Sequence, residues 1–304
     1  MLRDDEAGFI LTLFQGSARF LLCFDLGDLW LFMCRLFGVA SVKEITAEKY
    51  LLEVECSLYA QAVKGKQGDG WGVAWYDNGS PRIIKSEKPV YEERGRFEEA
   101  VQRAFSKIII AHVRKASNPR NLPREMIIGL EHTQPFQYRD RVFGHNGVIR
   151  IPDEVMDFLG DYRKIIKGNN DSEVYFALLM KEWDKLGDLV EALRSLEEIL
   201  WKALRKSNKN YEHPFSSLNA IFSDGEKLYA YNRYAEEEKL KELRSLCYGD
   251  APYYIMTYLV EGDWLIISSE ILWKTEEWRK LGNGMLLTAW IEDGKLRHRV
   301  DKVL

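Results

Sequence analysis

The sequence is poor in the residues that usually mark disulfide scaffolds, metal sites and nucleic-acid binding. Its four cysteines, at positions 23, 34, 56 and 247, form no CxxC pair and no secreted framework, so a reducing cytoplasm is the simplest predicted location. Its five histidines form no HExxH and no other close pair of the zinc type, and we expect no metal. A net charge of −4 leaves no basic excess for a nucleic-acid partner.

The first 33 residues lack the features of an export signal or a membrane anchor. They begin with Asp4-Asp5-Glu6, and their longest uncharged run, 7–18, is too short to span a bilayer. Two interpretations of 1–33 remain: a propeptide that is cut before Cys34, or a start assigned too early, with translation beginning at Met33. An ordinary N-terminal helix or strand would be favoured if the Met33-Cys34 pair stood alone. Without 1–33 the net charge is −1.

The Met33-Cys34 pair is the most informative feature that is present. Once the methionine is removed, Cys34 becomes an N-terminal residue with a thiol nucleophile and a free α-amine. The reference pKa of such an amine is about 8, so it can accept the thiol proton. The pair therefore predicts an N-terminal nucleophile whose base is its own amine.

Nothing in the sequence divides the rest of the chain. It shows no internal repeat, low-complexity stretch or linker, and with 46% hydrophobic and 12% aromatic residues it can bury a sizeable core. We predict one domain over 34–304. The charged fraction of 30% leans toward a thermophile-like composition.

Hydrophobic runs on both sides of tight-turn residues predict three β-hairpins. Their turns are Asp77-Asn78-Gly79, Asp224-Gly225 and Asp293-Gly294. A further apolar run, 107–114, is typical of a buried strand. Helical periodicity predicts helices over four ranges: 45–63, 94–105, 171–205 with a break near Gly187, and 235–246. Two polar segments, 118–124 and 167–170, are expected to be loops.

The glycine-rich segment 65–72 has two interpretations. It could be a phosphate-binding loop, but such a loop follows a strand and opens a helix, and the lysine-hydroxyl pair of the Walker motif is absent. Here a predicted helix precedes the segment and a predicted strand follows it. A turn that leads into the strand 71–76 is the better interpretation.

Several short segments, taken in order, form one pattern. They are Met33-Cys34-Arg35-Leu36-Phe37-Gly38, Gly68-Asp69-Gly70-Trp71-Gly72, Ala111-His112-Val113-Arg114, His132-Thr133-Gln134-Pro135-Phe136, Gly144-His145-Asn146-Gly147, Asn170-Asp171-Ser172-Glu173, and Leu218-Asn219 through Ser223-Asp224-Gly225. Over about 34–290 the chain resembles the class II glutamine amidotransferases, which are N-terminal-nucleophile hydrolases, and in particular the stand-alone domain proteins of that family. The resemblance implies an α+β fold, a four-layer α/β/β/α sandwich of two antiparallel sheets between helices.

The resemblance also implies roles for the catalytic residues. Cys34 would attack the side-chain amide of glutamine and form a γ-glutamyl thioester, which water then hydrolyses. The side-chain amide of Asn146 and the N–H of Gly147 would stabilise the oxyanion. Without the resemblance, a lone cysteine is usually a small buried hydrophobe and Asn-Gly is usually a hairpin turn.

Two residues would hold the amino-acid part of the substrate. Arg114 resembles the family arginine that binds the α-carboxylate, which a guanidinium can grip with two parallel hydrogen bonds. Asp171 resembles the aspartate that binds the α-ammonium. Their ordinary alternatives are a surface ion pair for Arg114 and, for Asp171, a first-turn acid in a helix capped by Asn170.

The chain departs from the family pattern at two places. His132-Thr133-Gln134-Pro135-Phe136 stands where many relatives have Asn-Thr-His-Pro-Phe, so we treat His132 and Gln134 as candidate substrate-binding residues that affect preference. Gln67 stands where a basic residue is common, and nothing in the sequence says what that changes.

The leading hypothesis is therefore a glutaminase-type amidohydrolase without a cofactor. The alternatives are a hydrolase of a γ-glutamyl amide metabolite, or a non-catalytic glutamine-binding regulatory module, which is favoured if Cys34 is never exposed as an N-terminus. The 271 residues from Cys34 to Leu304 match about one glutaminase domain. The expected partner is thus a small-molecule substrate, glutamine or a γ-glutamyl compound, with no nucleic acid and no membrane. The ammonia has three possible fates: transfer to a separate ammonia-accepting synthetase, release, or formation incidental to a different amide hydrolysis.

Overall fold

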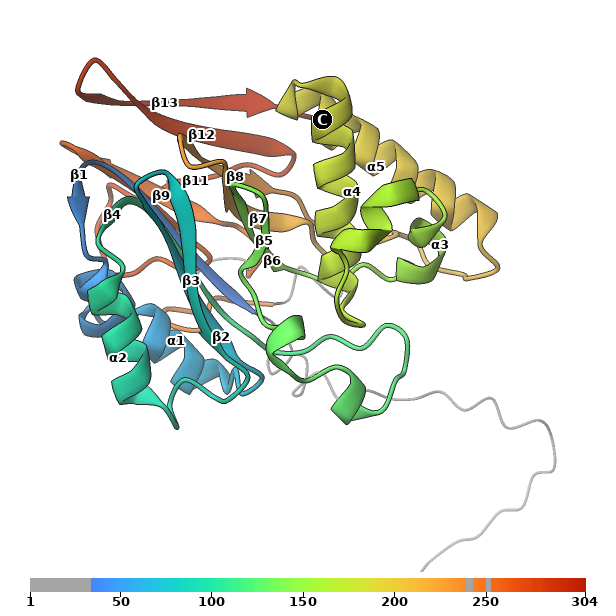
Figure 1. Ribbon diagram of the computed structural model, residues 1–304, viewed down its shortest axis with the longest axis horizontal. Helices are drawn as coiled ribbons and strands as arrows, with labels where there is room; N and C mark the ends of the chain where they lie inside the picture. Colours follow the sequence, from blue (N-terminus) through green and yellow to red (C-terminus); the bar gives the residue numbers. More distant parts are fainter. Residues whose placement is uncertain (1–33, 239–242, 250–252) are drawn as a thin grey trace, which may run out of the picture.

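The computed structural model describes residues 34–238, 243–249 and 253–304. Two antiparallel sheets lie face to face, and helices cover the outer face of each (Figure 1). The predicted α/β/β/α sandwich is confirmed. The possible propeptide or early start, 1–33, lies outside the described residues, and its nature stays a prediction.

The strand that follows Cys34 lies in the middle of the larger sheet. Its seven strands have the order β11-β9-β10-β1-β4-β2-β3. Their bounds are β1 Arg35–Ile45, β2 Trp71–Asp77, β3 Ser80–Ser86, β4 Ser106–Val113, β9 Thr257–Glu261, β10 Trp264–Ser268 and β11 Arg279–Lys280. The strand predicted over 107–114 is β4, and it pairs with both β1 and β2.

The smaller sheet has six strands, in the order β13-β12-β8-β7-β6-β5. Their bounds are β5 Phe136–Tyr138, β6 Arg141–Asn146, β7 Asn219–Ser223, β8 Lys227–Asn232, β12 Met285–Glu292 and β13 Lys295–Lys302. All three predicted hairpins are present, as β2–β3, β7–β8 and β12–β13. Both turn residues of the first and last have positive φ, for example 50° at Asn78 and 77° at Gly79, as type I′ turns require.

Five α-helices lie on the sheets within the described residues. They are α1 Leu58–Gly65, α2 Arg94–Arg103, α3 Pro152–Met156, α4 Asp171–Leu186 and α5 Leu189–Lys206. Short helical turns occupy Lys49–Glu53, Arg124–Met126, Leu130–His132 and Gly160–Ile165. The predicted break of the long helix at Gly187 is confirmed, since this residue ends α4 with a φ of 71°.

Two helix predictions need correction. The helix expected over 45–63 is two separate pieces, Lys49–Glu53 and Leu58–Gly65, because Ser57 caps a new helix through a hydrogen bond from Ala60 N–H. The helix expected over 235–246 is shorter at both ends, since 235–237 and 243–246 are not helical; Glu238 is helical, and 239–242 lie outside the described residues. Glu237, directly before the helical residue, forms an ion pair with Arg150.

Three hydrophobic clusters fill the three interfaces between the four layers. α1 and α2 pack on the outer face of the larger sheet, and α3, α4 and α5 on that of the smaller sheet (Figure 1). β1 serves two interfaces: Phe37 and Val39 face the helices, while Leu36 and Ala40 face the other sheet. Gly38 permits close contact between the sheets, since a Cβ there would lie 2.7 Å from Ile221.

Cys56 and Cys247 form a disulfide, which the cysteine spacing does not predict. This bond links the start of α1 to the 243–249 segment; the cytoplasmic location stays a prediction.

None of the described helices has both the length and the apolar character needed to cross a bilayer.

Candidate active site

The thiol of Cys34 lies against the turn that follows β4. Arg35 is paired with Val113 in the β1–β4 ladder, so Cys34, one residue earlier, meets the residues just after β4. The Lys115 N–H points to Sγ at 3.4 Å, and Sγ lies 3.3 Å from the Lys115 carbonyl. The antiparallel register therefore brings together two segments that were predicted separately from the sequence.

Burial keeps this thiol protonated. Cys34 is only 7% exposed, and desolvation raises its pKa to about 11, against a smaller opposite effect of the Arg114 charge. The carboxylates of Asp171 and Asp69 raise the pKa further. Because the chain continues through Met33, the Cys34 nitrogen is a peptide nitrogen and no α-amine stands beside the thiol. The thiol thus needs a nearby base before it can act as a nucleophile.

Arg114 is a buried cation held by backbone carbonyls. Its guanidinium donates hydrogen bonds to the carbonyls of Asp69, at 3.2 Å, and Ile127, at 2.8 Å. Within the described residues no carboxylate lies within ion-pair distance of it, although the side chain is only 2% exposed. Burial lowers its pKa, and the nearby carboxylates of Asp69, Asp171 and Glu173 offset this only in part. An anionic ligand would relieve this cost.

Asp171 reaches the same turn from the other sheet's helical layer. It is the first residue of α4, and Asn170 caps this helix by accepting a hydrogen bond from Ser172 N–H. The Asp171 carboxylate accepts a hydrogen bond from Ser117 Oγ at 2.5 Å and one from Ile149 N–H at 2.7 Å. Ser117 follows Lys115 by two residues, so Asp171 and Arg114 both approach the segment that holds Cys34.

Asp69 connects the predicted turn at 65–72 with the segment 114–116 that follows β4, and the sequence did not assign it a role of its own. Its Oδ2 accepts a hydrogen bond from Ala116 N–H at 2.8 Å, and its Oδ1 contacts the guanidinium of Arg124 at 2.5 Å. Its own N–H donates to the Arg114 carbonyl. Asp69 therefore fixes the turn that carries Arg114; its place within Gly68-Asp69-Gly70 was the available signal.

Asn146 and Gly147 lie at the end of β6, next to β7. Asn146 is 1% exposed, and its Oδ1 is a buried polar atom without a hydrogen-bond partner among the described residues. Only glycine fits at 147, since a Cβ there would lie 2.1 Å from the Ser217 carbonyl oxygen.

The family follows from a comparison with known proteins. The family model of the class II glutamine amidotransferases matches residues 33–302. The chain belongs to this family.

Individual relatives agree with the match. The chain is 30% identical over 280 residues to an uncharacterized protein, MJ1515, of Methanocaldococcus jannaschii, which covers 84% of this chain and 68% of that protein. It is 25% identical over 256 residues to the probable glutamine amidotransferase DUG3 of Saccharomyces cerevisiae, and the match covers 73% of this chain and 69% of that protein.

Solved structures show the same fold. A class II glutamine aminotransferase domain protein of Silicibacter pomeroyi superposes with a TM-score of 0.57 at 19% identity, over 88% of this chain and 98% of that one. The glutamine PRPP amidotransferase of B. subtilis gives a TM-score of 0.53 at 17% identity, over 88% of this chain and 49% of that one. This class II amidotransferase thus has the N-terminal-nucleophile hydrolase fold.

In this amidotransferase, His132 and Gln134 support the neighbouring loops. Gln134 Oε1 accepts a hydrogen bond from His145 N–H at 2.6 Å, directly before Asn146. His132 Nδ1 accepts one from Asn169 N–H at 3.3 Å, and the His132 carbonyl accepts one from the Asn170 side chain. Their role in substrate binding stays a prediction.

A buried ion pair behind Cys34 was not predicted from the sequence. Arg35 donates to the Cys34 carbonyl at 3.1 Å and forms an ion pair with Glu270 at 3.0 Å. The Tyr253 ring lies 3.8 Å from its guanidinium, and burial lowers the pKa of Arg35 to about 10. Arg35 thus links the Cys34 carbonyl to the carboxylate of Glu270.

One group of described residues has the geometry of a metal site. Cys56, Cys247 and Glu270 bring their ligand atoms within 4.8 Å of one another. The two sulfurs are joined in the disulfide, and Glu270 is paired with Arg35. The two sulfurs are therefore bonded to each other, and the carboxylate is bound to a cation of the protein.

Proposed function

We propose that this chain hydrolyses the side-chain amide of glutamine, with Cys34 as an N-terminal nucleophile. The observation that carries the proposal is the position of the buried Cys34 thiol, which contacts the backbone of Lys115. Arg114 directly precedes Lys115, and Ser117, two residues after it, donates a hydrogen bond to the Asp171 carboxylate. The family model, which begins at 33, supports it.

The base would be the α-amine of Cys34 itself. The thiol is protonated at neutral pH because its pKa is about 11 in the chain that retains Met33. Removal of the preceding residues puts an amine two bonds from Cβ, and a reference pKa of about 8 suits it for taking the thiol proton. The thiolate then attacks the amide carbon, the amine returns the proton to the leaving ammonia, and water hydrolyses the thioester.

The other residues would bind the substrate and its transition state. Arg114, a buried cation without an ion-paired carboxylate, would hold the α-carboxylate, and Asp171 would hold the α-ammonium. The Asn146 amide and the Gly147 N–H would donate to the oxyanion, where one such donor contributes about 3 kcal/mol to lowering the barrier.

Glutamine turnover in protein that begins at Cys34 tests this proposal. Cys34→Ala should abolish glutamate release and keep glutamine binding. Arg114→Lys keeps the charge but loses the paired hydrogen bonds, so turnover should fall strongly, and glutamate binding measured by calorimetry should weaken. Unchanged glutamate affinity in Arg114→Lys and Asp171→Asn would contradict the assigned binding roles. Turnover of a γ-glutamyl amide but not of glutamine would favour the metabolite hydrolase.

A further inference from the structure

A recess lies beside the segments that carry Gln134 and Asp171, since Pro135 and Glu173 are among its lining residues. It has a volume of about 200 Å³ and lies between β3, β5, the 160–167 segment and α4. Four charged residues line it, Lys85, Glu131, Lys167 and Glu173, together with an apolar surface from Phe136, Ile165 and Phe176. We call it the Lys167 recess. Cys34 and Arg114 are not among its lining residues.

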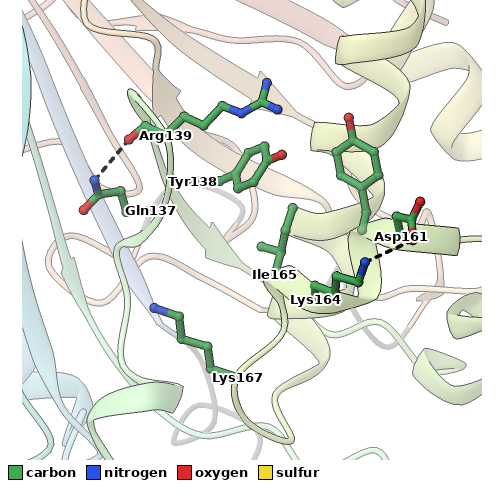
Figure 2. A pocket seen from close by; sticks show the side chains of 8 residues that line it. Gln137, Tyr138, Arg139, Asp161, Lys164, Ile165 and Lys167 are labelled. Atoms are coloured by element: carbon green, nitrogen blue, oxygen red, sulfur yellow. Dashed lines mark hydrogen bonds and ion pairs between the residues drawn. The ribbon is translucent and has the colours of Figure 1, made fainter.

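A larger hollow of about 760 Å³ adjoins the recess. Figure 2 shows it between Tyr138 and Arg139 on one side and Asp161, Lys164 and Ile165 on the other. The hollow and the recess share Gln137, Ile165 and Lys167, so they are continuous. The recess alone is smaller than the usual site for a drug-sized ligand, so it suits a small metabolite.

The two lysines of the recess lack a carboxylate partner. Within the described residues, neither Lys85 nor Lys167 forms an ion pair. Lys85 Nζ donates to the Thr133 carbonyl at 2.7 Å and lies 6.0 Å from the centre of the Phe136 ring. Burial lowers the pKa of Lys85 to about 8; the Glu173 and Glu131 carboxylates oppose this, while the positive charges of Lys167 and Arg114 add to it. An added carboxylate would stabilise both ammonium groups.

The same recess also carries two negative groups. Glu173 is 3% exposed, and burial raises its pKa although its carboxylate accepts hydrogen bonds from the Lys167 and Gly168 N–H groups. Glu131 lies at the rim, with its side chain 49% exposed. Two ammonium groups and two carboxylates around an apolar surface match a ligand that carries both charges better than a simple anion, which Glu173 would repel.

We propose that the Lys167 recess binds a free α-amino acid with an apolar side chain, separate from the glutamine site. Lys85 and Lys167 hold its carboxylate, Glu131 and Glu173 hold its ammonium group, and Phe136, Ile165 and Phe176 contact its side chain.

The walls of the recess continue into the candidate active site. On one side Glu173 holds the N–H groups of 167–168, which lead into the capped start of α4 at Asp171. On the other side Lys85 holds the Thr133 carbonyl, next to Gln134, whose side chain holds the strand end before Asn146. Occupation of the recess should therefore change glutamine turnover; this coupling, unlike the binding itself, rests on the proposed function.

Calorimetry of the full chain with L-leucine tests the binding directly. We expect saturable binding that weakens at least about tenfold in Lys167→Met, which keeps the backbone N–H to Glu173. Lys164→Met is the matched control, because Lys164 lines only the adjoining hollow, is 83% exposed and pairs with Asp161. Leucine affinity should be unchanged in this control and in Arg114→Lys.

Two half-ligands test the requirement for both charges. 4-Methylpentanoate lacks the ammonium group and 3-methylbutylamine lacks the carboxylate, so both should bind at least about tenfold more weakly than leucine. Glu131→Gln serves as a second variant if Lys167→Met does not fold, and it should also weaken leucine binding.

The outcomes separate this proposal from the proposed function. Absence of leucine binding, binding that survives Lys167→Met and Glu131→Gln, or binding lost in Arg114→Lys would overturn the second site. In protein that begins at Cys34, leucine should change the rate of glutamate release, and it should leave that rate unchanged when the same form carries Lys167→Met. If the form that begins at Cys34 releases no glutamate, the proposed function fails, while calorimetry still decides whether the recess binds leucine.

Discussion

Arg35 and Glu270 form an ion pair in which both side chains are fully buried, with 3.0 Å between Nη2 and Oε1. The pair lies directly behind Cys34, since Arg35 also donates a hydrogen bond to the Cys34 carbonyl. A buried charge that loses its partner is strongly destabilising.

The first prediction concerns this pair. Glu270→Leu should lower the free energy of unfolding by about 3–5 kcal/mol, because it leaves the Arg35 charge buried without a partner. Urea denaturation measures this change. The control is Glu98→Gln, which breaks the exposed Arg94–Glu98 pair and should cost less than about 1 kcal/mol. Equal effects of the two substitutions would show that the buried pair has no special role.

The second prediction concerns the reactivity of Cys34 in chains that keep Met33. Iodoacetamide reacts with the thiolate, so a pKa of about 11 means slow alkylation at pH 7 and a rate that rises about tenfold per pH unit toward pH 10. Mass spectrometry can follow the label in a Cys23→Ser background. Arg114→Met should slow the reaction, since the Arg114 charge lowers this pKa. A rate that levels off by pH 9 would contradict the burial effect.

The third prediction concerns the close packing at Gly147. Gly147→Ala should destabilise the protein by about 1–3 kcal/mol or displace the β6 end, because its Cβ would meet the Ser217 carbonyl. Thermal or urea unfolding measures this cost. Gly95→Ala is the control: it lies in α2 with nothing within 4 Å of the added Cβ and should stabilise the helix by about 0.5–1 kcal/mol. A stable Gly147→Ala protein with full activity would be inconsistent with this packing.

The fourth prediction concerns acid stability. Burial lowers the pKa of His112 from 6.5 to about 3, and it also lowers the pKa of His145. The unfolded chain therefore binds more protons below pH 6.5, and stability should fall with decreasing pH, by up to about 1.4 kcal/mol per pH unit from His112, with a further contribution of the same sign from His145. Urea denaturation between pH 7 and 5 gives the slope. His112→Gln should reduce this slope, and an unchanged slope would contradict the assignment.

Local sequence patterns identified much of the fold. The Asn-Gly and Asp-Gly turns demand positive φ, which fixes hairpins without knowledge of the rest of the chain. The segments around Cys34 and Arg114 could be recognised by pattern, and the β1–β4 register then places them together.

Contacts between distant segments could not be predicted in this way. The Arg35–Glu270 pair and the Cys56–Cys247 disulfide depend on which strands and loops become neighbours, and no local pattern encodes that choice. The same holds for the ends of the helix predicted over 235–246: Glu237, which is not helical, pairs with the distant Arg150.

The most direct test of the account compares glutamate release by two forms of the same protein. One form begins at Cys34, exposed by cleavage of a removable leader, and the other retains Met33. If the α-amine is the base, only the first form should turn over glutamine, and N-terminal sequencing of protein from its native host should begin at Cys34. Equal turnover by a form that verifiably retains Met33 would contradict the central claim, because its Cys34 nitrogen is a peptide nitrogen that cannot accept the thiol proton.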